Sequence, residues 1–128
     1  MRYLLDTHAA LWAIEDDARL GANARQLIAD NPTAEWGISD MTLLEVALLA
    51  SKGRIEFAGG MESKLAELGR CFRVLPIDPS IATDAVTLDL PQSDPFDRII
   101  VATARRYQLT LLSRDRLITQ SGLIETIW

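Results

Sequence analysis

The chain has 128 residues, 48% of them hydrophobic and 24% charged, which fits one folded domain spanning residues 1–128. Its formal net charge of −5 argues against a protein that coats nucleic acid through a basic surface. A single cysteine, no signal-peptide pattern and no apolar stretch long enough for a bilayer lead us to expect a cytoplasmic protein without a membrane segment.

Strands and helices are predicted to alternate along the chain. Uninterrupted apolar runs at Tyr3–Leu5 and 109–112 are typical of central strands buried on both faces, whereas Pro76 places its strand at an edge. The predicted fold class is α/β, a three-layer α/β/α arrangement around a mainly parallel sheet. In chain order, the elements are a strand at 2–5, helices at 8–14 and 21–31, a strand at 36–38, helices at 40–52 and 61–70, a strand at 72–77, helices at 79–88 and 95–107, a strand at 109–112, a helix at 114–120 and a strand at 124–128.

Acidic residues recur where predicted strands give way to helices. Asp6 ends the first strand, Glu45 lies one turn into the helix after the second, and Asp115 begins the last short helix. The carboxyl ends of parallel strands share one edge of a sheet, so these three side chains should meet there. Asp94 and Asp97, which open the helix at Pro95, can reach the same edge.

Each acid also has a purely structural explanation. Asp94 is a good N-cap ahead of a proline, and Asp115 complements the dipole of the helix that it begins. The spacing Thr42-x-x-Glu45 fits a capping box, although Ser39–Asp40 supplies competing caps. Taken singly, each acid is better explained by structure than by chemistry.

Taken together, the acids favour a metal site. Carboxylates gathered at one edge repel one another, and a divalent cation would neutralise that repulsion. Oxygen donors without a His or Cys cluster suit Mg²⁺, with Mn²⁺ as an alternative, rather than zinc, because His8 and Cys71 are the only residues of their kinds. Magnesium sites with few protein ligands often complete their shell with phosphate oxygens, which indicates phosphodiester chemistry.

The arginines that follow residue 97 supply local positive charge near these acids. We expect Arg98, Arg114 and Arg116 to contact substrate phosphates.

Several other residues invite functional readings that we set aside. His8 is expected to pack or hydrogen-bond beside the site, and Cys71 to be a small core residue. Trp12, Trp36 and Trp128 are expected in the core rather than as platforms for nucleobases.

Five segments, in order along essentially the whole chain, make the sequence resemble the PIN-domain ribonucleases, and especially the VapC-type toxins of bacterial toxin–antitoxin pairs. They are LLDTHAALW, ISDMTLLEVALLASKGRI, DPFDRIIVATA, LTLLSRD and the closing Trp. Two departures concern substrate contacts: Leu49 stands where related sequences often have Lys, and Gln92-Ser93 where they often have His-Arg.

The resemblance implies a PIN-like fold and a Mg²⁺-dependent endoribonuclease in which metal-activated water hydrolyses RNA. It further implies a cognate antitoxin and a homodimer as partners, with apolar surface around Glu45 available for such contacts. The alternative is a catalytically degenerate module of the same fold that binds Mg²⁺ or nucleic acid. By position, the resemblance makes Asp6, Glu45, Asp97 and Asp115 the catalytic and metal-binding acids, supported by Thr7, Ser113 and Asp94.

Overall fold

The computed structural model describes all 128 residues and contains one five-stranded sheet with seven helices. All strand pairs are parallel, and the strand order is β3-β2-β1-β4-β5. The predicted α/β class is therefore confirmed. The strands are β1 (Tyr3–Leu5), β2 (Trp36–Ser39), β3 (Arg73–Leu75), β4 (Thr110–Leu112) and β5 (Thr126–Ile127), and the helices are α1 (Thr7–Ile14), α2 (Ala22–Asp30), α3 (Asp40–Ser51), α4 (Met61–Cys71), α5 (Pro79–Thr87), α6 (Pro95–Arg106) and α7 (Arg116–Ser121).

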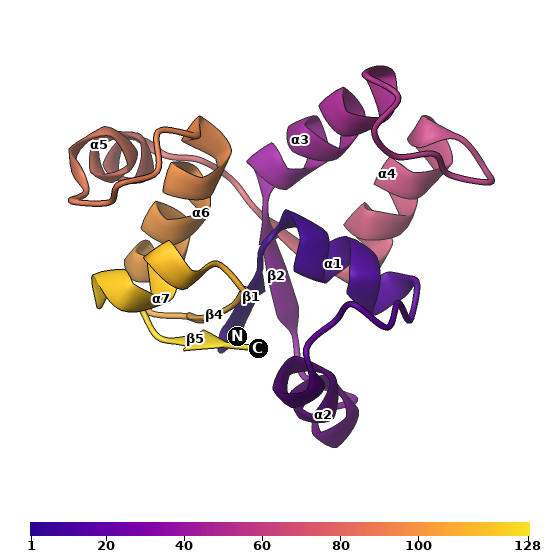
Figure 1. Ribbon diagram of the computed structural model, residues 1–128, viewed down its shortest axis with the longest axis horizontal. Coiled ribbons are helices and arrows are strands. Elements are labelled where there is room, and N and C mark those ends of the chain that lie inside the picture. The colour runs from indigo at the N-terminus through magenta and orange to yellow at the C-terminus, as the bar shows by residue number, and fades with distance from the viewer.

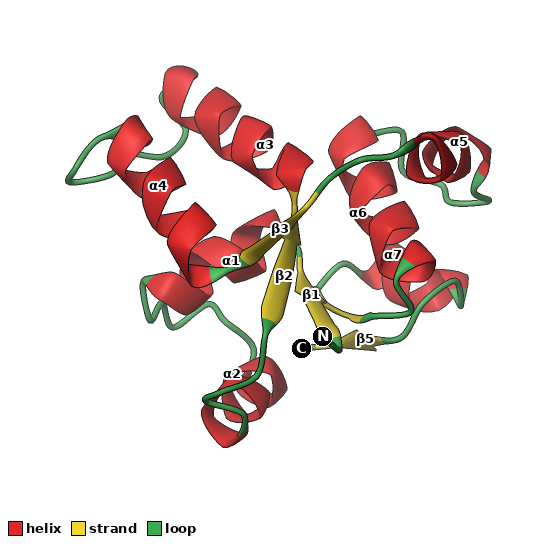
Figure 2. Ribbon diagram, turned by 180° about the vertical axis from the view of Figure 1, so that it is seen from behind, coloured by secondary structure: helices red, strands yellow, loops and turns green.

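The helices form layers on both faces of the sheet. Helices α1, α3 and α4 lie on one side of it and α5, α6 and α7 on the other, as both views of the ribbon show (Figures 1 and 2). Connections between parallel strands must cross a face of the sheet, so a chain that alternates strands with helices covers both faces.

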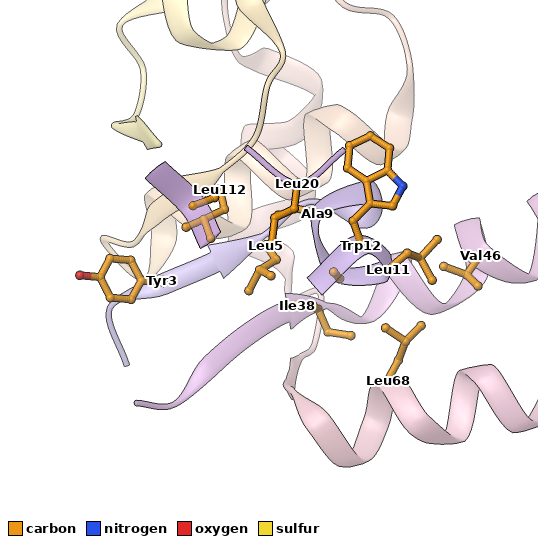
Figure 3. Close-up of a cluster of buried hydrophobic side chains, with 12 residues drawn as sticks. Tyr3, Leu5, Ala9, Leu11, Trp12, Leu20, Ile38, Val46, Leu68 and Leu112 are labelled. Carbon is orange, nitrogen blue, oxygen red and sulfur yellow. The ribbon is translucent and has the colours of Figure 1, made fainter. Parts of the chain in front are cut away.

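Alternation along β1 divides the core between the two faces. Tyr3 and Leu5 pack in one buried cluster, whereas Leu4 packs in another with Ile100 and Leu111. Figure 3 shows the first cluster, where side chains from β1, β2, α1, α3 and α4 converge. Successive strand residues point to opposite faces, so a central strand buried on both faces must be apolar throughout.

Most predicted elements are present, with shorter strands at the sheet edges. Strand β3 pairs only with β2, as Pro76 led us to expect of an edge strand. The last strand covers only 126–127. The prediction that Cys71 is a core residue was wrong, since Cys71 ends α4 and is exposed. This helix packs on the core through Leu68, which is fully buried, and its last residue lies outside that contact. No helix has both the length and the apolar character needed to cross a bilayer.

The order of the strands creates a crevice at one end of the sheet. The chain first adds β2 and β3 on one side of β1, and later adds β4 and β5 on its other side. The connection that leaves β1 therefore leads to one side of the sheet, toward β2, and the connection that leaves β4 leads to the other side, toward β5. A crevice forms between the carboxyl ends of β1 and β4, where these two connections diverge. Asp6 directly follows β1, and Asp115 lies three residues beyond the end of β4.

Candidate active site

An acidic cleft of about 380 Å³ lies at the carboxyl ends of the strands. All five carboxylates that the sequence analysis singled out line this cleft, although they come from four different connections. The cleft is lined by Asp6, His8, Trp12, Glu45, Asp94, Asp97, Arg114, Asp115 and Trp128.

Asp6 and Asp115 are both N-caps of the helices that they precede. Asp6 accepts a 2.8 Å hydrogen bond from the amide of Ala9 in α1. Oδ1 of Asp115 accepts from the amides of Leu117 and Ile118 in α7, at 2.9 and 3.1 Å. Asp6 and Asp115 thus cap a helix and line the cleft at the same time. Both roles are compatible because an N-cap residue lies at the junction of a strand with the next helix, which is where the cleft opens.

Glu45 is held by a residue of another helix rather than by a capping box. The N-cap of α3 is Ser39, whose hydroxyl accepts from the amide of Met41 at 3.1 Å. Thr42 is instead fully buried within the helix, with its hydroxyl 3.3 Å from that of Thr7. The Thr7 hydroxyl donates a hydrogen bond to Oε1 of Glu45. Because Glu45 does not cap its own helix, its carboxylate lines the cleft, where Thr7 orients it.

The two acids of the DPFDR segment have different environments. Asp94 is the exposed N-cap of α6 and accepts a 2.8 Å hydrogen bond from the amide of Phe96. Asp97, half-buried in the first turn, accepts no hydrogen bond within the protein and faces the other acids. Its carboxylate is thus uncommitted.

Mutual repulsion and burial raise the pKa values of three of these acids. Burial raises the pKa of Asp97 to about 7, with further contributions from Asp94, Glu45, Asp115 and Asp6. Burial also raises the pKa of Asp6, partly offset by a hydrogen bond from Ser113. Burial raises the pKa of Glu45, partly offset by Thr7. Each shift indicates that the surroundings of these carboxyl groups disfavour their charged form.

No basic side chain forms an ion pair with any of the five carboxylates. Their donors are all oxygens, the set preferred by Mg²⁺ and Mn²⁺. No three of these side chains converge closely enough to ligate one ion directly. The residues therefore fit a hydrated divalent cation bound by few carboxylates rather than a dehydrated cage.

The structure gives Arg98 a role different from the predicted phosphate contact. Its guanidinium donates four hydrogen bonds of 2.6–2.8 Å to main-chain carbonyls of the last turn of α5 and of the loop that leads to α6, which leaves at most one of its five donors. The acceptors are Ala85, Leu88, Leu90 and Gln92. By contrast, Arg114 and Arg116 are exposed at the end of β4 and the start of α7, and Arg114 lines the cleft.

Two residues of the site were missed. Gln92 donates a 2.8 Å hydrogen bond from Nε2 to Oδ1 of Asp115, and only its departure from the resembled pattern singled it out in the sequence. Trp128, expected in the core, is partly exposed and lines the cleft, while Trp12 is buried as predicted. Exposed His8 also lines the cleft, its ring 5.4 Å from that of Trp12.

Comparisons with known proteins agree with this architecture. A family model described as PIN domain matches residues 3–120. Ribonuclease VapC22 of Mycobacterium tuberculosis (strain ATCC 25618 / H37Rv) is 37% identical over 116 residues, which is 88% of this chain and 86% of the relative.

Solved structures resemble the chain over nearly its whole length. VapBC2 of Rickettsia felis, bound to a DNA fragment from its promoter, gives a TM-score of 0.74 at 16% identity, covering 99% of this chain and 98% of that chain. Mycobacterium tuberculosis VapC20, a sarcin-ricin loop cleaving toxin, gives 0.67 at 21% identity, covering 96% and 97%. At such identities the structural matches establish the fold alone.

Proposed function

The chain belongs to the PIN-domain family, and on that premise we propose that it is a metal-dependent endoribonuclease, the toxin of a type II toxin–antitoxin pair. The observation that carries the proposal is the cleft itself, in which five carboxylates gather without a basic partner. The 37% identity to Ribonuclease VapC22 supports RNA as the substrate class.

Four acids, Asp6, Glu45, Asp97 and Asp115, are proposed to hold hydrated Mg²⁺, with Mn²⁺ as an alternative, and no more than two of them bind one ion directly. The cation, when bound, supplies positive charge and acidifies water for hydrolysis of a phosphodiester. Asp97 contributes an uncommitted carboxylate, whereas Asp6 and Asp115 offer the oxygens that their capping bonds leave free.

The remaining residues orient these ligands and the substrate. Thr7 fixes the direction of the Glu45 carboxylate, Ser113 supports Asp6, and Asp94 caps α6 so that Asp97 faces the cleft. Exposed Arg116 and Arg114, of which Arg114 lines the cleft, are proposed to bind substrate phosphates, because positive charge is needed to bring RNA to an acidic cleft.

The proposed partners are a cognate antitoxin and a second copy of the chain. Solved complexes of the same fold, such as a toxin–antitoxin complex from Klebsiella pneumoniae, support the antitoxin. On this chain Leu44 and Leu48, one turn apart on α3, are 48% and 36% exposed, which supplies apolar surface for a partner.

The test is cleavage of single-stranded RNA by the purified chain with Mg²⁺, with Mn²⁺ and with EDTA. We expect cleavage with either metal, none in EDTA, and none by an Asp97→Asn variant prepared in parallel. Cleavage that persists in EDTA and in the variant would contradict the metal-dependent mechanism. RNA binding without cleavage under any metal condition would favour the catalytically degenerate alternative.

A further inference from the structure

Trp128 reaches the acidic cleft for the same topological reason as the acids. It directly follows β5, and β5 is parallel to β4, so the carboxyl ends of both strands lie at one edge of the sheet. Figure 1 marks the carboxyl terminus at the end of β5, and the amide of Ser113, just after β4, donates to the carbonyl of Ile127 at 3.1 Å. The partly exposed indole lines the cleft together with Trp12 and Arg114.

Close packing fixes the orientation of this indole. A Cβ atom on Gly21 would lie only 2.6 Å from Cγ and from Cδ1 of Trp128, so only glycine lets the ring approach this backbone. On another side, the ring of Trp12 meets it edge-on, with centroids 5.8 Å apart and planes at 60°. Binding a ligand therefore costs Trp128 little side-chain entropy.

The other tryptophans are not available in the same way. Trp12 is 4% exposed, with the guanidinium groups of Arg19 and Arg114 at 4.9 and 4.8 Å from its ring centroid. Trp36 begins β2, at the end of the sheet opposite to the cleft, and its ring stacks on Tyr3 with centroids 4.7 Å apart. Trp128 alone combines partial exposure with a place beside the acids.

Trp128 also lines a second recess, so it stands between two cavities. This recess, of about 450 Å³, runs along α2 and is lined by Trp128 together with Asn23, Gln26, Leu27, Asp30, Thr126 and Ile127. Asn23 and Gln26 carry amide side chains, which hydrogen-bond to nucleobase edges; Nε2 of Gln26 already donates to Oδ1 of Asp30 at 2.8 Å, which leaves its oxygen to accept. The acidic cleft suits a phosphate with its metal, whereas this neighbouring recess suits a base.

We propose that the indole of Trp128 stacks on a nucleobase adjacent to the scissile phosphate of a single-stranded RNA, while Arg114 binds the phosphate beside it. The inference rests on the proposed ribonuclease function and names how the substrate is held. Single-stranded RNA is commonly bound by stacking of splayed bases on aromatic side chains. The five carboxylates of the cleft repel the phosphates of RNA, but they do not weaken the stacking of a neutral base on an indole. Stacking can therefore hold RNA at a site where contacts to phosphate alone would be too weak.

The test measures binding of a short, fluorescein-labelled, single-stranded RNA of mixed sequence in EDTA, by fluorescence anisotropy. Trp128→Leu, which keeps apolar bulk without an aromatic face, should weaken binding by about 5- to 100-fold. Trp128→Phe should retain most of the affinity. Trp36→Leu is the matched control and should bind as the wild type does. Thermal unfolding of each variant identifies any that has lost the fold.

Intrinsic fluorescence provides a second readout that is independent of cleavage. The chain has three tryptophans, and RNA should quench part of the emission of the wild type but not of Trp128→Phe. If folded Trp128→Leu binds RNA like the wild type, or if quenching survives in Trp128→Phe, the stacking proposal is wrong even where the wild type cleaves RNA. A wild type that neither binds nor cleaves RNA would instead overturn the proposed function.

Discussion

The hydroxyl of Thr7 donates a hydrogen bond to Oε1 of Glu45 and thereby joins the first turn of α1 to α3. Thr7 is 3% exposed and its hydroxyl also lies 3.3 Å from that of Thr42. The residue directly after Asp6 therefore positions a carboxylate that is 38 residues away in the sequence.

Replacing Thr7 tests this link. Thr7→Val keeps the shape of the side chain but removes the donor, so Glu45 loses its orientation; we expect metal-dependent RNA cleavage to fall by about 10- to 100-fold. Thr7→Ser keeps a hydroxyl and should retain most of the activity. Both variants are compared by initial rates across a Mg²⁺ titration. Equal rates for Thr7→Val and the wild type would show that the hydrogen bond does not matter.

Asp94 and Asp97 should respond differently to the same substitution. Asn caps a helix as well as Asp does, so Asp94→Asn should have only a mild effect on cleavage and on stability. Asp97→Asn removes the uncommitted charge and should abolish Mg²⁺-dependent cleavage. The two variants are assayed side by side for rate and for thermal stabilisation by Mg²⁺. The opposite pattern would reverse the assignment, and inactivity of both would mean that the acids share the metal.

The raised pKa of Asp97 predicts how the stability of the metal-free protein depends on pH. Between the ordinary value of 3.8 and about 7, the folded chain binds a proton that the unfolded chain has released. The free energy of unfolding should therefore fall as the pH rises through this window and then level off. Because the carboxyl group is partly solvent-screened, we expect only about 1–2 kcal/mol from this residue.

Urea unfolding in EDTA at about pH 5 and about pH 8 measures this dependence. Asp97→Asn should be less sensitive to pH than the wild type and more stable than it at the higher pH. Asp6 and Glu45, with pKa values raised in the same direction, should leave the variant some residual sensitivity. An unchanged pH dependence in the variant would mean that Asp97 titrates normally.

Arg98 and Arg114 should separate stability from RNA binding. In Arg98→Lys, the lysine ammonium cannot reproduce the planar guanidinium that donates to four carbonyls. We therefore expect this variant to lose about 2–3 kcal/mol of the free energy of unfolding. Arg114→Ala should lose less than about 1 kcal/mol, the worth of an exposed cation–π contact, and should weaken RNA binding instead. Denaturant unfolding and RNA anisotropy are measured on both. A stable Arg98→Lys with weakened RNA binding would restore the phosphate contact predicted from the sequence.

The sequence by itself determined the class of fold and the set of acids that meet in the cleft. Apolar runs such as Tyr3–Leu5 are typical of strands buried on both faces, and the carboxyl ends of parallel strands share an edge. Asp6, Glu45 and Asp115 could therefore be placed together from the sequence, and all three line the cleft. Helix caps were predictable too, since a cap depends on residues within one turn; the Asp94–Pro95 start of α6 is an example.

Only the tertiary structure decided which side chains remain free in that cleft. Whether Arg98 faces substrate or carbonyls depends on the path of the loop between α5 and α6, which no local pattern encodes. The contacts of Gln92 with Asp115 and of Thr7 with Glu45 join segments 23 and 38 residues apart. Trp128 followed the apolar pattern of a core residue, yet the packing of Gly21 and Trp12 leaves its indole at the rim. Periodicity fixes the buried face of an element, but the partner of each side chain depends on how distant elements pack.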